Sequence, residues 1–131
     1  MGPRLTNQRS RLRRAYQGFG WGLVALGLLH MAATFQAFDA LSGAAVWFFG
    51  SGIALVLTGV FNLLNVRYAQ TAAGLRWCCI VTNVAMSVFA TIAGVVTHAS
   101  MPEFIVILGL IGGATVLSVL RGAVAIPESG A

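Results

Sequence analysis

The chain has 131 residues, of which 58% are hydrophobic and only 8% are charged. A soluble domain of ordinary composition carries about 45–50% apolar and about 25% charged residues. So few charges cannot cover a water-exposed surface, which excludes a soluble globular enzyme, a disordered tail and a nucleic-acid module, despite a formal net charge of +5. The length fits one domain, and the composition predicts that this domain lies in a membrane.

The charged residues divide the chain into four long uncharged stretches. These hold 24 residues after Arg14, 27 after Asp39, 26 after Arg76 and 17 after Glu103. A membrane-spanning helix needs about 20 predominantly apolar residues, so each stretch fits one span. We expect helices at 17–38, 45–66, 77–97 and 103–120. Runs such as LVALGLL do not alternate as barrel strands do, which predicts an all-α, polytopic four-helix transmembrane bundle.

The arginines alternate between successive connections of this bundle. The segment 1–14 holds five, 39–44 none, 67–76 two and 98–102 none, and Arg121 follows the last span. Positive residues favour the cytoplasmic side of a membrane, so we expect both termini in the cytoplasm, with tails at 1–14 and 122–131 around a membrane domain at 15–121. Aromatic anchors are expected at the interfaces: Trp47 on the outer side, and Tyr16, Trp21, Tyr68 and Trp77 on the cytoplasmic side.

The first span follows a basic block, as the core of a cleaved signal peptide does. Its uncharged stretch of 24 residues is longer than the about 7–15 residues of such a core, and no clean small-residue cleavage site follows it. We therefore expect a retained membrane anchor. The arginines ahead of it are expected to set the orientation and to contact the lipid surface.

Glycines and polar residues recur at helical spacing within the predicted spans. Two GxxxG pairs, Gly18 with Gly22 and Gly109 with Gly113, favour close helix packing, as do two pairs spaced by seven residues, Gly20 with Gly27 and Gly52 with Gly59. Polar stripes run along the second and third spans and could face each other, either to fix the register of the bundle or to line a polar cavity. Their members are Thr58, Asn62, Asn65, Asn83, Ser87 and Thr91.

His30 is the ionisable residue that lies well inside a predicted span, which makes it a candidate functional residue. His98, Asp39 and Glu103 are all expected near the same, outer surface. Metal or haem ligation by these groups is conceivable, but nothing in their spacing demands it, and we expect no metal site and no cofactor. The adjacent Cys78 and Cys79 are expected to pack as small apolar side chains.

Other chemistry is disfavoured by what the spans lack. Every carboxylate stands at the edge of a span or in a tail, unlike the membrane-embedded glutamate of small four-helix multidrug antiporters. The chain also carries no Gly-x-Ser-x-Gly, His-Glu-x-x-His or phosphate-loop motif. We therefore expect a protein that is not an enzyme.

His30, the run WFFGSGIAL at 47–55 and the run GVFNLLN at 59–65 resemble small four-span bacterial inner-membrane proteins of unassigned function. The size, the number of spans and the glycine-rich second span that ends in Arg67 are similar to the DoxX-like group. Some members of that group are implied to be accessory subunits of membrane redox systems. The resemblance implies a location in the bacterial cytoplasmic membrane.

The sequence thus predicts an accessory or scaffold subunit that acts through helix–helix contacts in the lipid bilayer, with a second copy or another membrane subunit as its partner. One alternative is a small transporter or channel component lined by the polar stripes. The other is a redox-associated subunit with His30 and His98 as ligands. The candidate functional polar residues are His30, Asn62, Asn65, Asn83 and His98.

Overall fold

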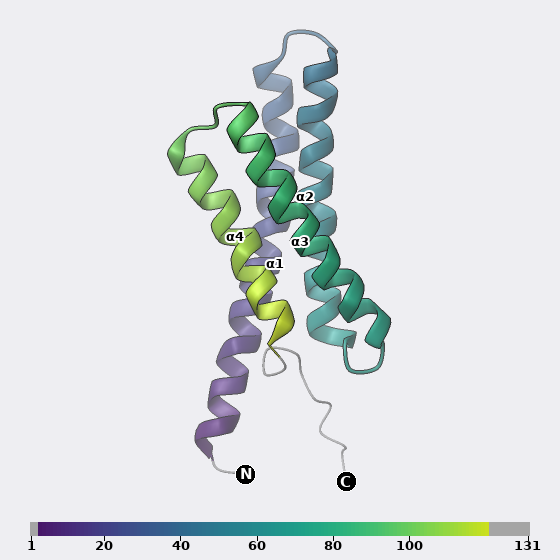
Figure 1. The fold of residues 1–131 in the computed structure, drawn as a ribbon, viewed down its shortest axis with the longest axis vertical. Coiled ribbons are helices and arrows are strands. Elements are labelled where there is room, and N and C mark those ends of the chain that lie inside the picture. Colours follow the sequence, from purple (N-terminus) through teal and green to yellow (C-terminus); the bar gives the residue numbers. More distant parts are fainter. Residues whose placement is uncertain (1–2, 121–131) are drawn as a thin grey trace.

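The computed structural model describes residues 3–120, which form four helices that run alternately up and down (Figure 1). Helix α1 spans Pro3–Ala37, α2 spans Gly43–Tyr68, α3 spans Ala73–Val96 and α4 spans Met101–Val119. All four are long and apolar enough to cross a membrane. The chain is therefore a small, all-α polytopic membrane protein, as its composition predicts. Arg121 and the predicted tail at 122–131 lie outside the described residues.

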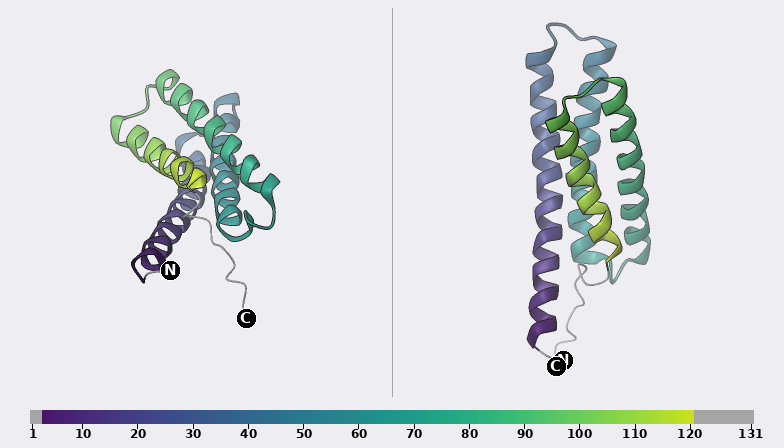
Figure 2. Two further views of the ribbon diagram at one scale, coloured as in Figure 1. Left: turned by 60° about the horizontal axis from the view of Figure 1, so that its bottom comes forward. Right: turned by 60° about the vertical axis from the view of Figure 1, so that its left-hand side comes forward.

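Helix α1 begins at Pro3 instead of residue 17, so the basic segment ahead of the first span is helical and continues into the span (Figure 2). Proline is favoured at the first position of a helix, where its missing N–H group would have no partner. No glycine or proline interrupts the chain between Pro3 and Gly18, and arginine is a good helix former. Hydropathy locates the apolar part of a helix, and it misses a polar extension of the same helix.

The other helix ends differ from the predicted ones by at most four residues. Polar caps outside the apolar stretches explain part of this difference. The Ser42 hydroxyl accepts a hydrogen bond from the backbone N–H of Ala45 at 3.2 Å and thereby starts α2. At α4, Ser100 and Glu103 form a capping box in which the Ser100 backbone N–H donates to the Glu103 carboxylate at 3.1 Å.

The helices are arranged in a ring, in which each packs on its neighbours in the order α1, α2, α3, α4 (Figure 2). Helices α1 and α3 face each other across the centre without backbone contact, and α2 and α4 touch only slightly. The interface between α1 and α2 is the most extensive. A side chain from α1 that reaches α3 must therefore cross the middle of the bundle.

Glycines on both helices allow α1 and α2 to approach closely. A Cβ atom built on Gly27 would lie 2.6 Å from the carbonyl oxygen of Gly52, and one built on Gly59 would lie 2.7 Å from that of Gly20. The two pairs spaced by seven residues thus face each other across the interface, which confirms the packing predicted for them. With no hydrophobic force between helices in lipid, such close contact is a main source of attraction.

The GxxxG pairs make fewer close contacts between helices than their spacing predicts. A Cβ atom on Gly18 or on Gly109 would meet no atom within 4 Å, so the prediction of close packing inside the bundle is wrong for these two residues. Their partners do pack between helices, Gly22 against Leu110 and Gly113 against Phe19. The motif gives a spacing along one helix, but it does not say which face meets a neighbour.

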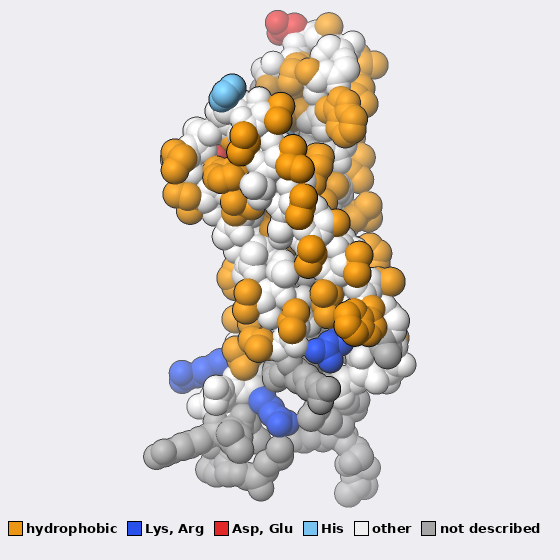
Figure 3. Space-filling model, viewed as in Figure 1, with side chains coloured by type: hydrophobic (Ala, Val, Ile, Leu, Met, Phe, Trp, Pro, Cys, Tyr) orange, Lys and Arg blue, Asp and Glu red, His pale blue; other side chains and the backbone are white. Residues whose placement is uncertain are grey.

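The outer surface of the bundle is largely apolar, and the charges lie at its ends (Figure 3). Large side chains such as Phe35 and Trp47 are more than 70% exposed, which suits contact with lipid. One end, called the arginine end here, carries the beginning of α1, the Arg67 end of α2 and the Arg76 end of α3. Asp39 and Glu103 lie toward the opposite end. The described residues thus have the apolar girdle and charged rim of a membrane-spanning bundle.

We expect Gly52→Ala to lower the free energy of unfolding by about 1–3 kcal/mol, because the new methyl group would be forced against the backbone of α1. Gly50→Ala is the matched control, since a Cβ atom there meets nothing within 4 Å. Replacing a glycine inside a helix by alanine should stabilise the control by up to about 1 kcal/mol. Unfolding of both variants by sodium dodecyl sulfate in mixed micelles measures the difference. Equal effects of the two substitutions would contradict the close contact of α1 and α2.

Candidate functional site

Five buried polar side chains from three helices meet near the arginine end and form what we call the polar cluster. They are Tyr16 of α1, Asn62 and Asn65 of α2, and Cys79 and Asn83 of α3. Each has an exposed fraction of 0%. A hydrophobic cluster of buried residues adjoins them, since it consists of Tyr16 itself with Val66, Ala69 and Leu117. The cluster is thus the main polar feature inside the described bundle.

The side-chain amides of Asn62 and Asn83 pair with each other across α2 and α3. Asn62 Nδ2 donates to Asn83 Oδ1 at 2.7 Å, and Asn83 Nδ2 donates back to Asn62 Oδ1 at 2.9 Å. The second hydrogen of Asn62 Nδ2 goes to the carbonyl oxygen of Thr58 at 2.8 Å. This pairing confirms that the polar stripes of the second and third spans face each other at this level.

Tyr16 joins α1 to the same amides. Its hydroxyl donates to Asn62 Oδ1 at 2.8 Å and accepts from Asn65 Nδ2 at 2.8 Å. The Tyr16 oxygen also lies 3.5 Å from the Cys79 sulfur, so it bridges α1 and α3 across the centre of the bundle. The prediction of Tyr16 as an aromatic anchor at the membrane surface is therefore wrong. Its ring points inward because its hydroxyl has buried amide partners there.

Trp21, Tyr68 and Trp77 are exposed, as expected for anchors. They therefore present their rings to the surroundings of the bundle, whereas Tyr16 does not. The depth of an aromatic residue in the membrane does not decide whether it faces inward. That choice depends on its direction around the helix and on the partners it finds.

The acceptor Oδ1 of Asn65 has no hydrogen-bond partner among the described residues, although it is buried. A buried amide oxygen left unpaired costs free energy, and most such groups in proteins are paired. Asn65 therefore combines a fixed position, through its bond to Tyr16, with an unused acceptor.

The chemistry of the polar cluster is that of neutral hydrogen bonds. Amides, a phenol and a thiol hold its helices in one register, and no carboxylate, imidazole or guanidinium takes part in the bonds that join them. A hydrogen bond between helices in a membrane is worth about 0.6 kcal/mol on average and up to about 1.7 kcal/mol. Several bonds on one amide make Asn62 the centre of this arrangement.

The rest of the polar stripes does not extend the polar cluster. The hydroxyls of Thr58, Ser87 and Thr91 donate to carbonyl oxygens four residues earlier in their own helices, at 2.7–2.8 Å. Along α3, Asn83 is buried, Ser87 is half-buried and Thr91 is exposed. The stripe of α3 therefore turns from the interior to the outer surface along its length.

His30 and His98 take up separate structural positions. The His30 ring stacks on Phe48 of α2, with centroids 3.8 Å apart and an interplanar angle of 22°. His98 lies exposed in the turn after α3 with φ of 52°, where its N–H and that of Ala99 cap the end of that helix. No hydrogen bond or ring contact joins the two within residues 3–120. No group of three or more metal-ligating side chains gathers there either.

The sequence places Asn62, Asn65 and Asn83 among the candidates, and the structure brings these three together. Sequence reasoning missed Tyr16 and Cys79 as members. Their depth in the membrane could have revealed both residues. In antiparallel spans, the start of the first span, the end of the second and the start of the third lie at the same depth. Cys79 is buried in the cluster, whereas its neighbour Cys78 is exposed.

No protein-family model, no curated protein and no solved structure matches this chain.

Tyr16→Phe should lower the free energy of unfolding by about 1–3 kcal/mol, because it removes a partner of Asn62 and leaves the Asn65 amide without its bond to Tyr16. Tyr68→Phe removes the same atom from an exposed ring and should change stability by less than about 0.5 kcal/mol. The same titration in mixed micelles measures both variants. If the two substitutions had the same effect, the polar cluster would not stabilise the bundle.

Proposed function

We propose that this four-span protein is a non-enzymatic accessory or scaffold subunit that acts through helix–helix contacts. The observation that carries the proposal is the closure of the polar cluster, since the buried amides of α2 and α3 bond to each other and to α1. What the bundle offers to other molecules within the membrane is therefore its apolar outer surface. Interaction of that surface with another transmembrane helix is the function it supports best.

Helix α4 offers a surface suited to such a contact. Ile105, Gly109, Gly112 and Val116 follow one another at intervals of four, three and four residues and form the α4 stripe. Ile105 and Val116 are more than 60% exposed, and a Cβ atom on either glycine would meet nothing within 4 Å. This spacing matches the seam of two packed helices, and glycine allows their backbones to approach.

We also propose a bacterial cytoplasmic membrane as the location, with both termini in the cytoplasm. The arginine end supports this orientation, because Arg67, Arg76 and the arginines of α1 lie together there while Asp39 and Glu103 lie toward the other end (Figure 3).

A transporter or channel component is the second candidate, and the unpartnered Asn65 Oδ1 favours it. A polar acceptor inside a bundle can serve a passing solute that carries a donor. Transport requires a water-accessible path to the polar cluster, whereas an accessory subunit does not. The two candidates are therefore distinguished by whether water reaches the polar cluster.

For the accessory role, we expect a reproducible membrane partner to copurify with the wild-type chain in mild detergent. Gly109→Leu should abolish this copurification without lowering the free energy of unfolding, because a Cβ atom at this exposed position meets no described atom within 4 Å. Val88→Phe adds bulk to an exposed position of α3 and is the control that should keep the partner. A solitary monomer in every mild detergent, or a partner retained by Gly109→Leu, would count against the proposal.

For the transport alternative, single cysteines at positions 58, 62, 83 and 87 in a cysteine-free background are expected to resist a membrane-impermeant thiol reagent. The first three positions are buried and the fourth is half-buried. Leu41→Cys and Thr71→Cys, in exposed turns at opposite ends, are the controls. In intact cells we expect reaction at position 41, and at position 71 only after permeabilisation. Reaction at these four positions would favour transport, and the reverse order of the controls would overturn the orientation.

A further inference from the structure

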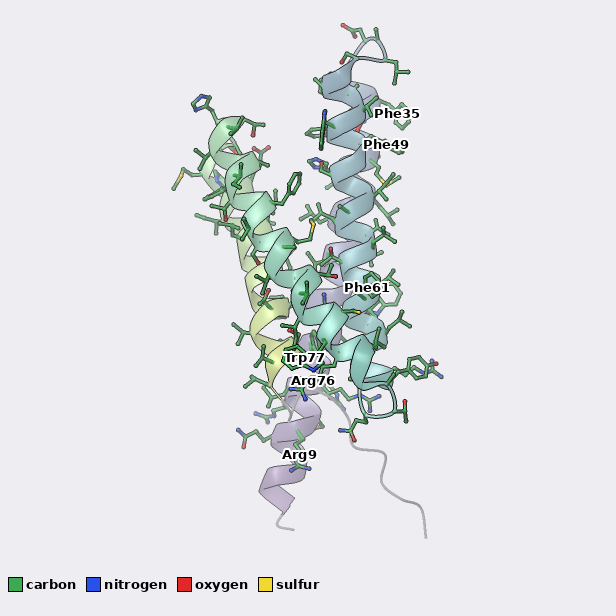
Figure 4. All side chains as sticks on the ribbon, turned by 45° about the vertical axis from the view of Figure 1, so that its right-hand side comes forward. Arg9, Phe35, Phe49, Phe61, Arg76 and Trp77 are labelled. Carbon is green, nitrogen blue, oxygen red and sulfur yellow. The ribbon has the colours of Figure 1, made fainter. Side chains whose placement is uncertain are left out.

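The arginine end gathers guanidinium groups from three helices. Within the described side chains, α1 contributes four of them, all exposed, and α2 and α3 contribute one each. They are Arg9, Arg11, Arg13, Arg14, Arg67 and Arg76. Figure 4 shows Arg76 beside Trp77 at this end, with Arg9 further out along α1. The positive charge is thus fixed on rigid helices instead of being spread over a loose tail.

Exposed aromatic rings mark the depth of this end in the membrane. Trp21 of α1, Tyr68 of α2 and Trp77 of α3 are 63%, 43% and 69% exposed. Tryptophan and tyrosine gather at the level of the lipid headgroups. Since Tyr68 and Trp77 directly follow Arg67 and Arg76, these two arginines lie where the phosphates of the lipids are expected.

The arginines of α1 extend from this level into water. Arg14 lies about 10 Å beyond Trp21 along the helix axis, at 1.5 Å per residue, and Arg9 about 7.5 Å beyond Arg14. The Debye length at physiological salt is about 8 Å, which is close to the distance from Arg14 to Arg9. Arg9 therefore still acts on charges near Arg14, but more weakly than Arg14 does. The effect of each arginine on a lipid surface should therefore fall from Arg14 to Arg9.

The described part of the chain offers these arginines no carboxylate partner. Asp39 and Glu103 lie toward the opposite end of the bundle (Figure 3). Arg76 donates to the carbonyl oxygen of Val119 at 2.8 Å, and Arg67 lies 5.4 Å from the ring centre of Tyr68. These contacts hold the two guanidinium groups in place and leave most of their N–H donors free to bind an anion.

We propose that the arginine end is a binding site for the phosphodiester headgroups of anionic phospholipids, with Arg67 and Arg76 as its inner contacts and the exposed Arg13 and Arg14 of α1 contributing at the same end. The planar guanidinium group can donate to two oxygens of one phosphate at once, which a headgroup phosphodiester offers. The neighbouring exposed aromatic rings suit a headgroup whose acyl chains continue along the bundle. This inference does not depend on the accessory role proposed above.

The test is retention of lipid by the detergent-purified full chain after exchange into nanodiscs of phosphatidylcholine with an equal share of phosphatidylglycerol. Native mass spectrometry should show phosphatidylglycerol enriched over phosphatidylcholine on the protein, and the enrichment should fall as salt is raised. Arg67→Gln with Arg76→Gln should reduce the enrichment about fivefold for each arginine removed. Arg9→Gln with Arg11→Gln is the matched control and should reduce it less, because these residues lie further from the headgroups.

The paired lysine variants Arg67→Lys and Arg76→Lys keep the charge and guard against a loss of folding. They should keep the salt dependence and lose part of the enrichment. Equal retention of the two lipids by the wild-type chain would overturn the proposal. So would displacement of the lipid by inorganic phosphate at matched phosphate concentration, which would indicate a site for the free anion. Displacement by an acidic protein or RNA at physiological salt would likewise assign the surface to another partner.

Discussion

The side-chain amide of Asn62 is the contact on which the arrangement of the bundle depends. It pairs with Asn83 on α3 and accepts from Tyr16 on α1, so one side chain of α2 fixes the positions of both neighbours. Hydrocarbon supplies no water to replace a missing partner, so a polar group within a span must be satisfied inside the protein. A shift of any of these helices by one turn would break several of these bonds together.

Apolar contact sets the distances that the polar cluster requires. The glycines of α1 and α2 let the two backbones touch, which places Tyr16 within reach of Asn62 and Asn65. Helix α4 joins through Phe19 against Gly113 and through the bond from Arg76 to Val119. Close packing and hydrogen bonds thus act at different levels of the same bundle, and each makes the other geometrically possible.

This division between interior and surface relates the fold to its proposed roles. The buried polar side chains bond to one another or to carbonyl oxygens of their own helices, so contacts with other molecules are expected at the outer faces and the ends of the bundle. The α4 stripe suits another helix, and the arginine end suits a phosphate surface. The buried Asn65 acceptor stands apart from this pattern, because it lies inside the bundle with no partner in the described chain.

The sequence by itself determined the number and type of spans, because the free energy of burying charge in lipid depends on composition and length alone. It also placed Asn62, Asn65 and Asn83 on polar stripes through helical periodicity. Only the tertiary structure decided which faces meet. In the folded bundle Tyr16 points inward, and His30 lies apart from His98. Gly52 packs against α1, whereas Gly109 is exposed. The period of a sequence pattern gives the direction of a side chain around its own helix. A contact between two helices also depends on how both helices are rotated and on their depth in the membrane.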